Sequence, residues 1–207
     1  MRLRLRRRDG ALRVVSNPNL FVLTGGPGAG KTTVLLELEK RGYQVAPEVA
    51  RRIIQEQVRD GGRALPWADR KLYTDLMLTR SVESYLEYAP ASRPVFFDRG
   101  IPDTLGYAWL IELEDQGAIR HACHLHRYAP CVFVAPPRRE IYRTDSERKQ
   151  DFAEAVRTCE TVAGAYRDCG YEVVELPRST PGQRADYILE RLRQMRTSSC
   201  RHGVVAG

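Results

Sequence analysis

The spacing of apolar residues along the chain predicts an α/β fold. Five short apolar runs are separated by segments in which apolar positions recur every three or four residues. Apolar runs without polar alternation are typical of strands buried on both faces, and strands that alternate with helices form parallel sheets through right-handed crossovers. We therefore expect a doubly wound, five-stranded parallel sheet. The predicted strands are residues 20–24, 43–46, 95–97, 131–135 and 172–176.

The segments between these strands have helical spacing and helix-ending residues. In the first, Val34, Leu35 and Leu38 share one face, and Gly42 stands where the helix should end. Residues 61 and 62 are both glycine and separate the next two helices. The predicted helices are residues 31–41, 48–59, 66–87, 102–114, 117–127, 147–168 and 181–196.

A chain of 207 residues favours one domain, which we place at residues 18–196. Residues 1–17 are interpreted as a basic N-terminal segment and residues 197–207 as a frayed tail. The apolar runs are too short to cross a bilayer, and no secretory signal follows the N-terminus, so we expect a cytoplasmic protein without a membrane partner. The five cysteines show no metal-binding spacing, so reduced thiols and no zinc are expected.

The net charge of +7 raises the question of a polyanionic partner. Five arginines stand in residues 1–8, where a solvated basic tail is the simplest interpretation. A nucleic-acid partner is therefore not expected, and the sequence does not choose between a monomer and a homodimer.

Residues 25–32 match the phosphate-binding pattern G-x-x-x-x-G-K-[ST], between a predicted strand and a predicted helix. Glycines let backbone N–H groups surround phosphate oxygens at the positive end of the helix. In such a loop Lys31 reaches the β and γ phosphates, and the Thr32 hydroxyl binds Mg²⁺. A dinucleotide loop is the alternative, but it leaves both side chains without a role. The predicted nucleotide-binding residues are Gly25, Gly26, Pro27, Gly28, Ala29, Gly30, Lys31, Thr32 and Thr33.

Asp98 and Arg99 follow the third predicted strand, at the sheet edge where ligands of such folds bind. We expect Asp98 to hold Mg²⁺ through its water shell and Arg99 to contact phosphate or acceptor. The alternative is that Asp98 caps the helix that begins near residue 102.

Glu48 follows the second predicted strand and is the candidate for the base that takes the proton from an attacking hydroxyl. Arg51 and Arg52, one turn further on, are candidates for binding an anionic acceptor. In the alternative interpretation, Glu48 is a first-turn acid that the helix dipole favours.

A basic segment after the fourth strand contains Arg143 and Arg148, which could close over the transferring phosphoryl group. A solvated helix face, with neighbouring acids as partners, is the alternative. Trp67, Tyr73 and Tyr107 could stack on an acceptor ring, but aromatic residues at helical spacing are more often part of a core.

These motifs together resemble a widespread bacterial family of small P-loop proteins labelled AAA-type ATPases. The family is similar to nucleoside and ribosylnicotinamide kinases rather than to ring-forming ATPases, and the resemblance covers about residues 20–192. It implies a kinase-like fold, ATP with Mg²⁺ and an arginine-bearing lid. In deoxynucleoside kinases a Glu after the second strand is the base, and an acidic-Arg-Ser motif follows the third strand. Glu48, Asp98 and Arg99 match these positions, but Gly100 replaces the serine.

Two functions follow from the sequence. The first is an ATP- and Mg²⁺-dependent kinase for a hydroxyl of an unidentified small molecule, with Lys31, Glu48, Asp98, Arg99, Arg143 and Arg148 as catalytic residues. The second is an ATPase that acts as a nucleotide-dependent switch for a protein or nucleic-acid partner. No Asn-Lys-x-Asp stretch for guanine is present, and neither the acceptor nor the preference for ATP over GTP can be read from the sequence.

Overall fold

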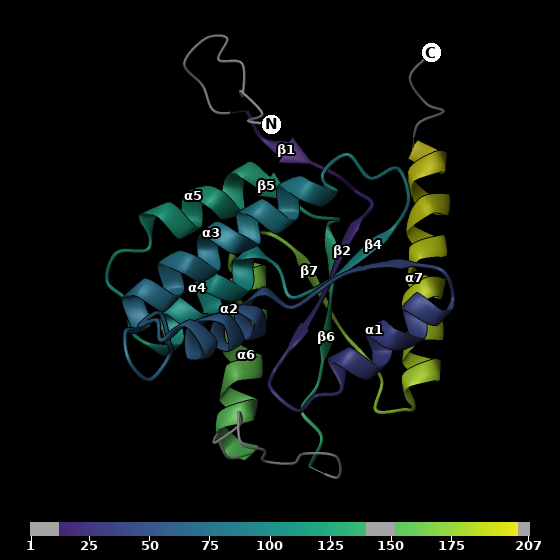
Figure 1. Ribbon diagram of the computed structural model, residues 1–207. Helices are drawn as coiled ribbons and strands as arrows, with labels where there is room; N and C mark the ends of the chain where they lie inside the picture. The colour runs from purple at the N-terminus through teal and green to yellow at the C-terminus, as the bar shows by residue number, and fades with distance from the viewer. Residues whose placement is uncertain (1–12, 140–151, 203–207) are drawn as a thin grey trace.

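In the computed structural model, five parallel strands form the centre of the protein (Figure 1). The structure describes residues 13–139 and 152–202, with side chains as far as residue 197. The spatial order of the strands is β3-β4-β2-β6-β7, which confirms the predicted α/β class with a five-stranded parallel sheet. The strands are β2 (Leu20–Gly25), β3 (Gln44–Ala46), β4 (Val95–Asp98), β6 (Cys131–Ala135) and β7 (Glu172–Glu175).

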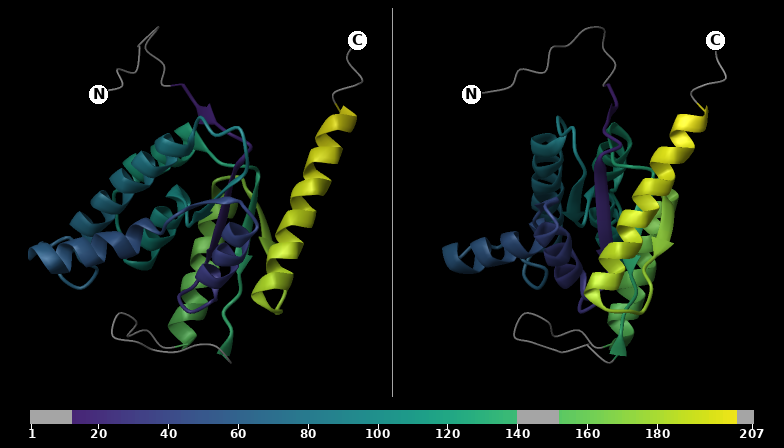
Figure 2. Two further views of the ribbon diagram at one scale, coloured as in Figure 1. Left: turned by 45° about the vertical axis from the view of Figure 1, so that its right-hand side comes forward. Right: turned by 90° about the vertical axis from the view of Figure 1, so that its right-hand side faces the viewer.

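Helices cover both faces of this sheet (Figures 1 and 2). One face packs against α1 (Lys31–Lys40) and α7 (Pro181–His202). The other face packs against α3 (Arg70–Tyr88), α4 (Ile101–Leu110), α5 (Gly117–Leu125) and α6 (Phe152–Asp168). The remaining helix of the described chain, α2 (Val49–Asp60), packs against α3 through Ile53, Tyr73 and Met77.

The central strand β2 explains why its sequence is an unbroken apolar run. Leu20 and Val22 point into the cluster under α3 to α6, whereas Phe21 and Leu23 point into the cluster under α1 and α7. Successive side chains of a strand face opposite sides of the sheet, so a strand covered on both sides has no solvent-facing position. The two cores are thus built from alternate residues of the same strands.

Register brings the functional motifs to one edge of the sheet. Leu23 of β2 lies opposite Asp98 of β4, and Ala46 of β3 lies opposite Phe97. Because all five strands are parallel, the segments that leave their carboxyl ends emerge on the same side. The glycine loop after β2, Glu48 after β3 and Arg99 after β4 therefore meet there.

A second, two-stranded parallel sheet was not predicted. It pairs β1 (Val15–Ser16) with β5 (His126–Arg127), so the helix expected over residues 117–127 ends at Leu125. The side chain of Asn17 donates to the carbonyls of Ala89 and Ala91, each at 2.9 Å. The folded unit therefore begins before residue 18, contrary to the predicted boundary. Pairing between segments more than a hundred residues apart leaves no local pattern.

Three other helix boundaries differ from the prediction by more than one residue. Helix α7 continues to His202, so the tail expected to fray after residue 196 is helical for a further turn and more. Helix α3 begins at Arg70 rather than residue 66, because the Asp69 carboxylate accepts from Leu72 N at 3.0 Å and caps the helix. Helix α4 ends at Leu110. Residues 147–151 of the expected sixth helix lie outside the described residues.

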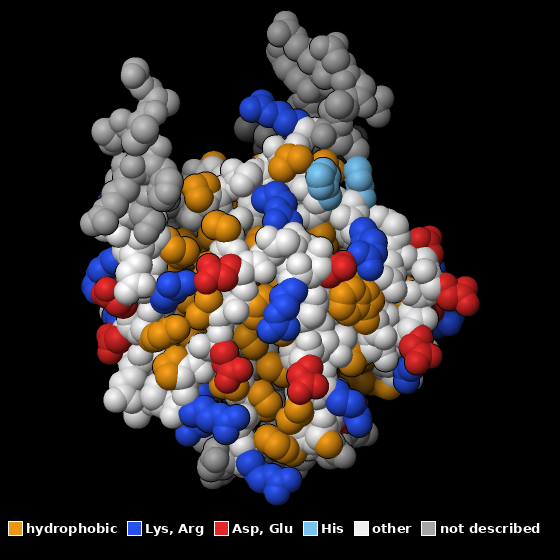
Figure 3. All heavy atoms as spheres, turned by 180° about the vertical axis from the view of Figure 1, so that it is seen from behind, with side chains coloured by type: hydrophobic (Ala, Val, Ile, Leu, Met, Phe, Trp, Pro, Cys, Tyr) orange, Lys and Arg blue, Asp and Glu red, His pale blue; other side chains and the backbone are white. Residues whose placement is uncertain are grey.

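No helix within the described ranges is long and apolar enough to cross a membrane. On the face seen from behind, side chains of Lys and Arg are interspersed with those of Asp and Glu (Figure 3). The positive net charge is thus not gathered into one basic surface on that face.

Candidate functional site

The glycine loop packs so closely that two of its positions exclude a side chain. Gly25 has a φ of 134°, and a Cβ there would lie 2.4 Å from the carbonyl oxygen of Ala135. A Cβ at Gly26 would lie 2.4 Å from the carbonyl oxygen of Ala155. Gly30 has a φ of 81° and directly precedes α1, so the loop ends at a helix N-terminus. A concave backbone at the positive end of a helix is suited to bind phosphate.

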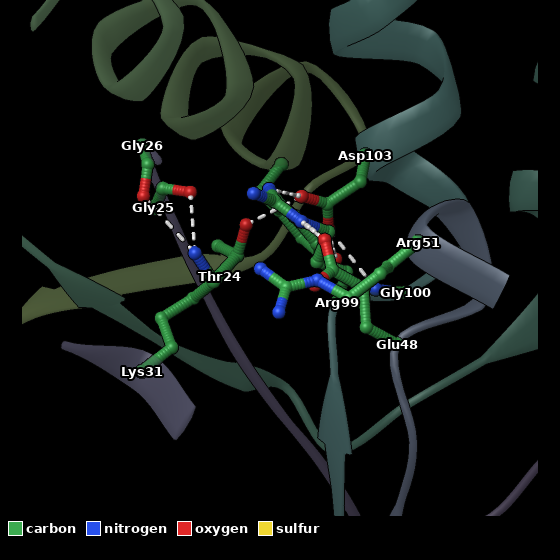
Figure 4. Close-up of polar contacts among 10 residues, drawn as sticks. Thr24, Gly25, Gly26, Lys31, Glu48, Arg51, Arg99, Gly100 and Asp103 are labelled. Atoms are coloured by element: carbon green, nitrogen blue, oxygen red, sulfur yellow. Dashed lines mark hydrogen bonds and ion pairs between the residues drawn. The ribbon is translucent and has the colours of Figure 1, made fainter. Parts of the chain in front are cut away.

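Lys31 is buried beneath this loop. Its Nζ donates to the carbonyl oxygens of Gly25 at 3.2 Å and Gly26 at 3.0 Å (Figure 4). Burial, and then the charge of Arg99, lowers the pKa of Lys31 from 10.5 to about 8, against the opposing effect of nearby carboxylates. Both causes disfavour the charged form of the Lys31 amine.

Glu48 and Arg99 form an ion pair across the end of the sheet. Arg99 Nε donates to Glu48 Oε1 at 2.9 Å, and Arg51 Nε lies 3.7 Å from Glu48 Oε2 (Figure 4). Burial alone would raise the pKa of Glu48, but Arg99, Lys31 and Arg51 outweigh it, so the pKa lies below its ordinary value. Glu48 is therefore ionised at neutral pH, as a proton acceptor must be. Its side chain does not cap α2, although it precedes the first residue of that helix.

Asp103 is the polar centre of the site, although no role was predicted for it. Its carboxylate is 5% exposed and accepts from four donors (Figure 4). Oδ1 accepts from the Thr24 hydroxyl at 2.6 Å and from Arg99 Nη1 at 2.9 Å. Oδ2 accepts from the Tyr166 hydroxyl at 2.7 Å and from Gly100 N at 3.0 Å.

These bonds also explain an unusual backbone conformation. Arg99 has a φ of 70°, a region that a long side chain rarely adopts. Its N–H donates to Leu23 O at 3.1 Å, and its guanidinium is held between Glu48 and Asp103. Burial would lower the pKa of Arg99, but Glu48, Asp103 and Asp98 raise it above the ordinary value, so its charge is permanent.

Asp98 is the last residue of β4, directly before Arg99, and is 7% exposed. Its Oδ1 and the Thr104 hydroxyl are buried without hydrogen-bond partners in the described part of the chain. Both residues line a cavity of about 20 Å³, the volume of about one water molecule. Burial raises the pKa of Asp98, with Lys31 as the main opposing charge. Helix α4 is capped by Asp103 through Gly100 N, so the alternative role of Asp98 as that cap is wrong.

One open cleft of about 1370 Å³ is lined by Lys31, Glu48, Arg99 and Asp103. Residues 27–33 of the loop line it together with Glu48, Arg51 and Arg99. Arg184 also lines the cleft; its Nη1 donates to Ala29 O at 3.0 Å and its Nε to Pro177 O at 2.9 Å, which ties the glycine loop to the segment before α7. The sequence pattern predicts no role for Arg184, because its partners are backbone carbonyls of distant segments.

Some of the predicted site residues line the cleft and others do not. Thr32 is exposed and lines it, so its hydroxyl is accessible to a metal ion. Arg52 is exposed on α2 but does not line the cleft, so the structure does not bring it to the site. Arg143 and Arg148 lie outside the described residues. Trp67, for which both a stacking role and a place in a core were considered, is exposed in the cleft.

We expect the Asp103→Ala substitution to lower the free energy of unfolding by about 3–5 kcal/mol. It leaves Arg99 Nη1 and two buried hydroxyls without their acceptor, and breaking such a buried pair from one side has that cost. Urea unfolding at neutral pH measures the loss. The control is Asp69→Ala, which removes the cap of α3 and should lower the free energy by about 1 kcal/mol. Equal losses in the two variants would contradict the central role of Asp103.

Known structures share this arrangement of elements. The NadR protein in complex with NR matches with a TM-score of 0.62 and 19% identity, over 85% of this chain and 50% of that chain. Deoxyadenosine kinase from M. mycoides, with products dCMP and dCDP bound, matches with a TM-score of 0.59 and 15% identity, over 85% and 99%. Shikimate kinase from Acinetobacter baumannii, in complex with shikimate, matches with a TM-score of 0.52 and 20% identity, over 86% and 93%. The shared feature is the P-loop kinase fold.

Among curated proteins, none matches the sequence. A family described as "AAA domain" matches residues 20–184, which include the glycine loop, Glu48, Asp98 and Asp103. This match agrees with the resemblance to small P-loop proteins, which rests on the sequence motifs. The chain therefore belongs to this AAA-domain family, with the fold of the small P-loop kinases.

Proposed function

We propose that the protein is an ATP- and Mg²⁺-dependent phosphotransferase that phosphorylates a hydroxyl group of a small molecule. The observation that carries the proposal is the single cleft in which the glycine loop and Lys31 lie beside the ionised Glu48 and the fixed Arg99. A phosphoryl donor and a proton acceptor in one cleft are the two elements that such a transfer needs. The kinase-like neighbours support the same class of reaction.

Each described residue has a distinct role in the proposed transfer. The loop N–H groups and Lys31 bind the triphosphate, and Lys31 stabilises charge on the transferring group. Glu48 accepts the proton of the acceptor hydroxyl. Arg99 holds Glu48 ionised and presents its remaining donors to phosphate or acceptor. Arg51, half exposed at the cleft, is placed to bind an anionic group of the acceptor, and Arg143 and Arg148 remain proposals for the transferring phosphoryl.

The residues present fit a magnesium ion. The accessible Thr32 hydroxyl would be a direct ligand, and Asp98, whose buried Oδ1 lacks a protein donor, would hold the ion through bound water. When bound, Mg²⁺ would neutralise the charge that develops on the phosphates during transfer.

The pKa of Lys31 leads to a prediction about pH. Above about pH 8 the nucleotide-free protein holds Lys31 neutral, so a bound triphosphate must draw a proton onto it. We therefore expect affinity for Mg·ATP to fall as pH rises above 8, by up to about tenfold per pH unit, with proton uptake on binding. Calorimetry in buffers of different ionisation enthalpy measures both.

The matched variant for this prediction is Lys31→Arg. A guanidinium stays charged throughout the range, so the pH dependence of binding should disappear even where affinity is reduced. A wild-type affinity that does not change above pH 8 would contradict the assignment.

The Glu48→Gln substitution tests the base. It removes the proton acceptor but keeps the size of the side chain, so we expect kcat to fall by about 10²–10⁴ while ATP affinity changes little. Arg52→Gln, on the same helix but outside the cleft, is the control and should keep wild-type turnover. Full turnover in Glu48→Gln would assign the base elsewhere.

The reaction itself is tested by phosphorus NMR of ATP in the presence of a library of hydroxylated metabolites. Acceptor-dependent loss of the γ-phosphate signal and a new phosphate-ester signal are expected, and both should vanish with Lys31→Ala. Hydrolysis at one rate with every compound would favour the second candidate, an ATPase that acts as a nucleotide-dependent switch.

A further inference from the structure

The cleft extends beyond Glu48 along a wall that is largely apolar. Helices α2, α3 and α4, together with the turn before α3, build this wall on the side of the molecule away from α7 (Figures 1 and 2). We call it the apolar wall. Its members are Ile54, Val58, Trp67, Tyr73, Met77, Tyr107 and Leu110.

Three residues of the apolar wall are exposed despite their size. Val58 is 61% exposed, Trp67 is 65% exposed and Leu110 is 39% exposed. Single exposed apolar residues are ordinary on protein surfaces, but a concave surface that gathers several of them is typical of a binding site. Leu72, 46% exposed on α3, lies outside the cleft and shows the ordinary case.

The buried end of the apolar wall meets the polar groups of the reaction. The ring of Tyr73 packs edge-on against Tyr107, with centroids 5.3 Å apart and an interplanar angle of 78°. Tyr73 lines the same cleft as Arg99 and Glu48, so the polar groups and the apolar wall face one space.

Two of the polar side chains near the apolar wall already have hydrogen-bond partners. The Asp103 carboxylate already accepts from four donors. Arg59 is held by Asp60 through bonds of 2.7 and 2.9 Å. Gln55 is exposed. A ligand with many polar edges would leave them without partners against this wall, which disfavours binding strongly.

We propose that the phosphate acceptor is an amphipathic molecule, with its reactive hydroxyl at one end of an apolar, ring-containing body. The hydroxyl lies at Glu48 and Arg99, and the body lies along the apolar wall, where it covers Val58, Trp67 and Leu110. Polyols and nucleosides, whose polar groups are spread over the whole molecule, fit this wall less well. The inference rests on the proposed phosphotransferase function and specifies its substrate class.

Direct binding tests the class of acceptor. The probes are 2-naphthylmethanol, cytidine and sorbitol, each titrated calorimetrically into the full chain with Mg²⁺ and a non-hydrolysable ATP analogue. We expect the naphthyl alcohol to bind at least about tenfold more tightly than either polar probe. Tighter binding of cytidine or sorbitol, or no binding of the naphthyl alcohol at millimolar concentration, overturns the inference.

Charged substitutions locate the probe on the apolar wall. Val58→Asp and Leu110→Asp should each weaken naphthyl alcohol binding about tenfold or more, with the affinity for the ATP analogue unchanged. Leu72→Asp makes the same chemical change at a similarly exposed position outside the cleft and should have no effect. Equal weakening by Leu72→Asp, or none by the other two, overturns the inference. Circular dichroism of each variant confirms that it is folded.

Fluorescence gives a second readout that does not depend on turnover. The chain has two tryptophans, and Trp67 is the one in the cleft. The naphthyl alcohol should alter Trp67 emission, and Trp67→Phe should abolish the change while calorimetric binding persists. If the naphthyl alcohol alters the emission of Trp67→Phe as much as that of the wild type, the probe binds elsewhere.

Phosphorus NMR with the same probes separates the two proposals. Transfer to cytidine or sorbitol in preference to the naphthyl alcohol would contradict the amphipathic acceptor but support the phosphotransferase. Binding of the naphthyl alcohol on the apolar wall, without transfer to any hydroxyl compound, would contradict the phosphotransferase.

Discussion

The buried carboxylate of Asp103 connects the groups of the candidate site to the core. It accepts from β2 through Thr24, from α6 through Tyr166, from the turn before α4 through Gly100 N, and from Arg99. A carboxylate out of contact with water is tolerated only when its oxygens are satisfied, and here each oxygen has two donors. The position of Arg99, and through it that of Glu48, therefore depends on the packing of β2, α4 and α6.

This dependence explains how a strained residue can hold a functional position. Arg99 adopts a backbone conformation that is unfavourable for its side chain, yet its N–H and its guanidinium are both bonded. Unfavourable conformations persist where the surrounding structure determines them from several sides, and they gather at functional sites. The result is a guanidinium that keeps Glu48 ionised beside the buried Lys31.

The cleft divides into parts of different chemistry. The glycine loop and Lys31 suit phosphate, and the pair of Glu48 and Arg99 suits a reacting hydroxyl. Beyond them, the apolar wall from α2, α3 and α4 presents mainly apolar contact surface rather than hydrogen-bonding groups. Orientation by a few polar groups and affinity from apolar contact is the usual division in small-molecule sites. In this protein the two contributions come from different layers of the fold, so they can be altered separately.

The sequence by itself determined the sheet, the glycine loop and the positions of Glu48, Asp98 and Arg99 after their strands. Those features depend on local spacing, and the carboxyl ends of parallel strands necessarily lie at the same edge of the sheet. Only the tertiary structure decided that Asp103 joins four segments, that Arg184 ties the loop to the segment before α7, and that Val15 pairs with His126. For Trp67 the sequence left a stacking role and a place in a core both open, and only the structure shows it exposed in the cleft, because a helical period specifies a face and not what that face meets. Contacts between residues far apart in sequence have no local signature, and this site is largely made of them.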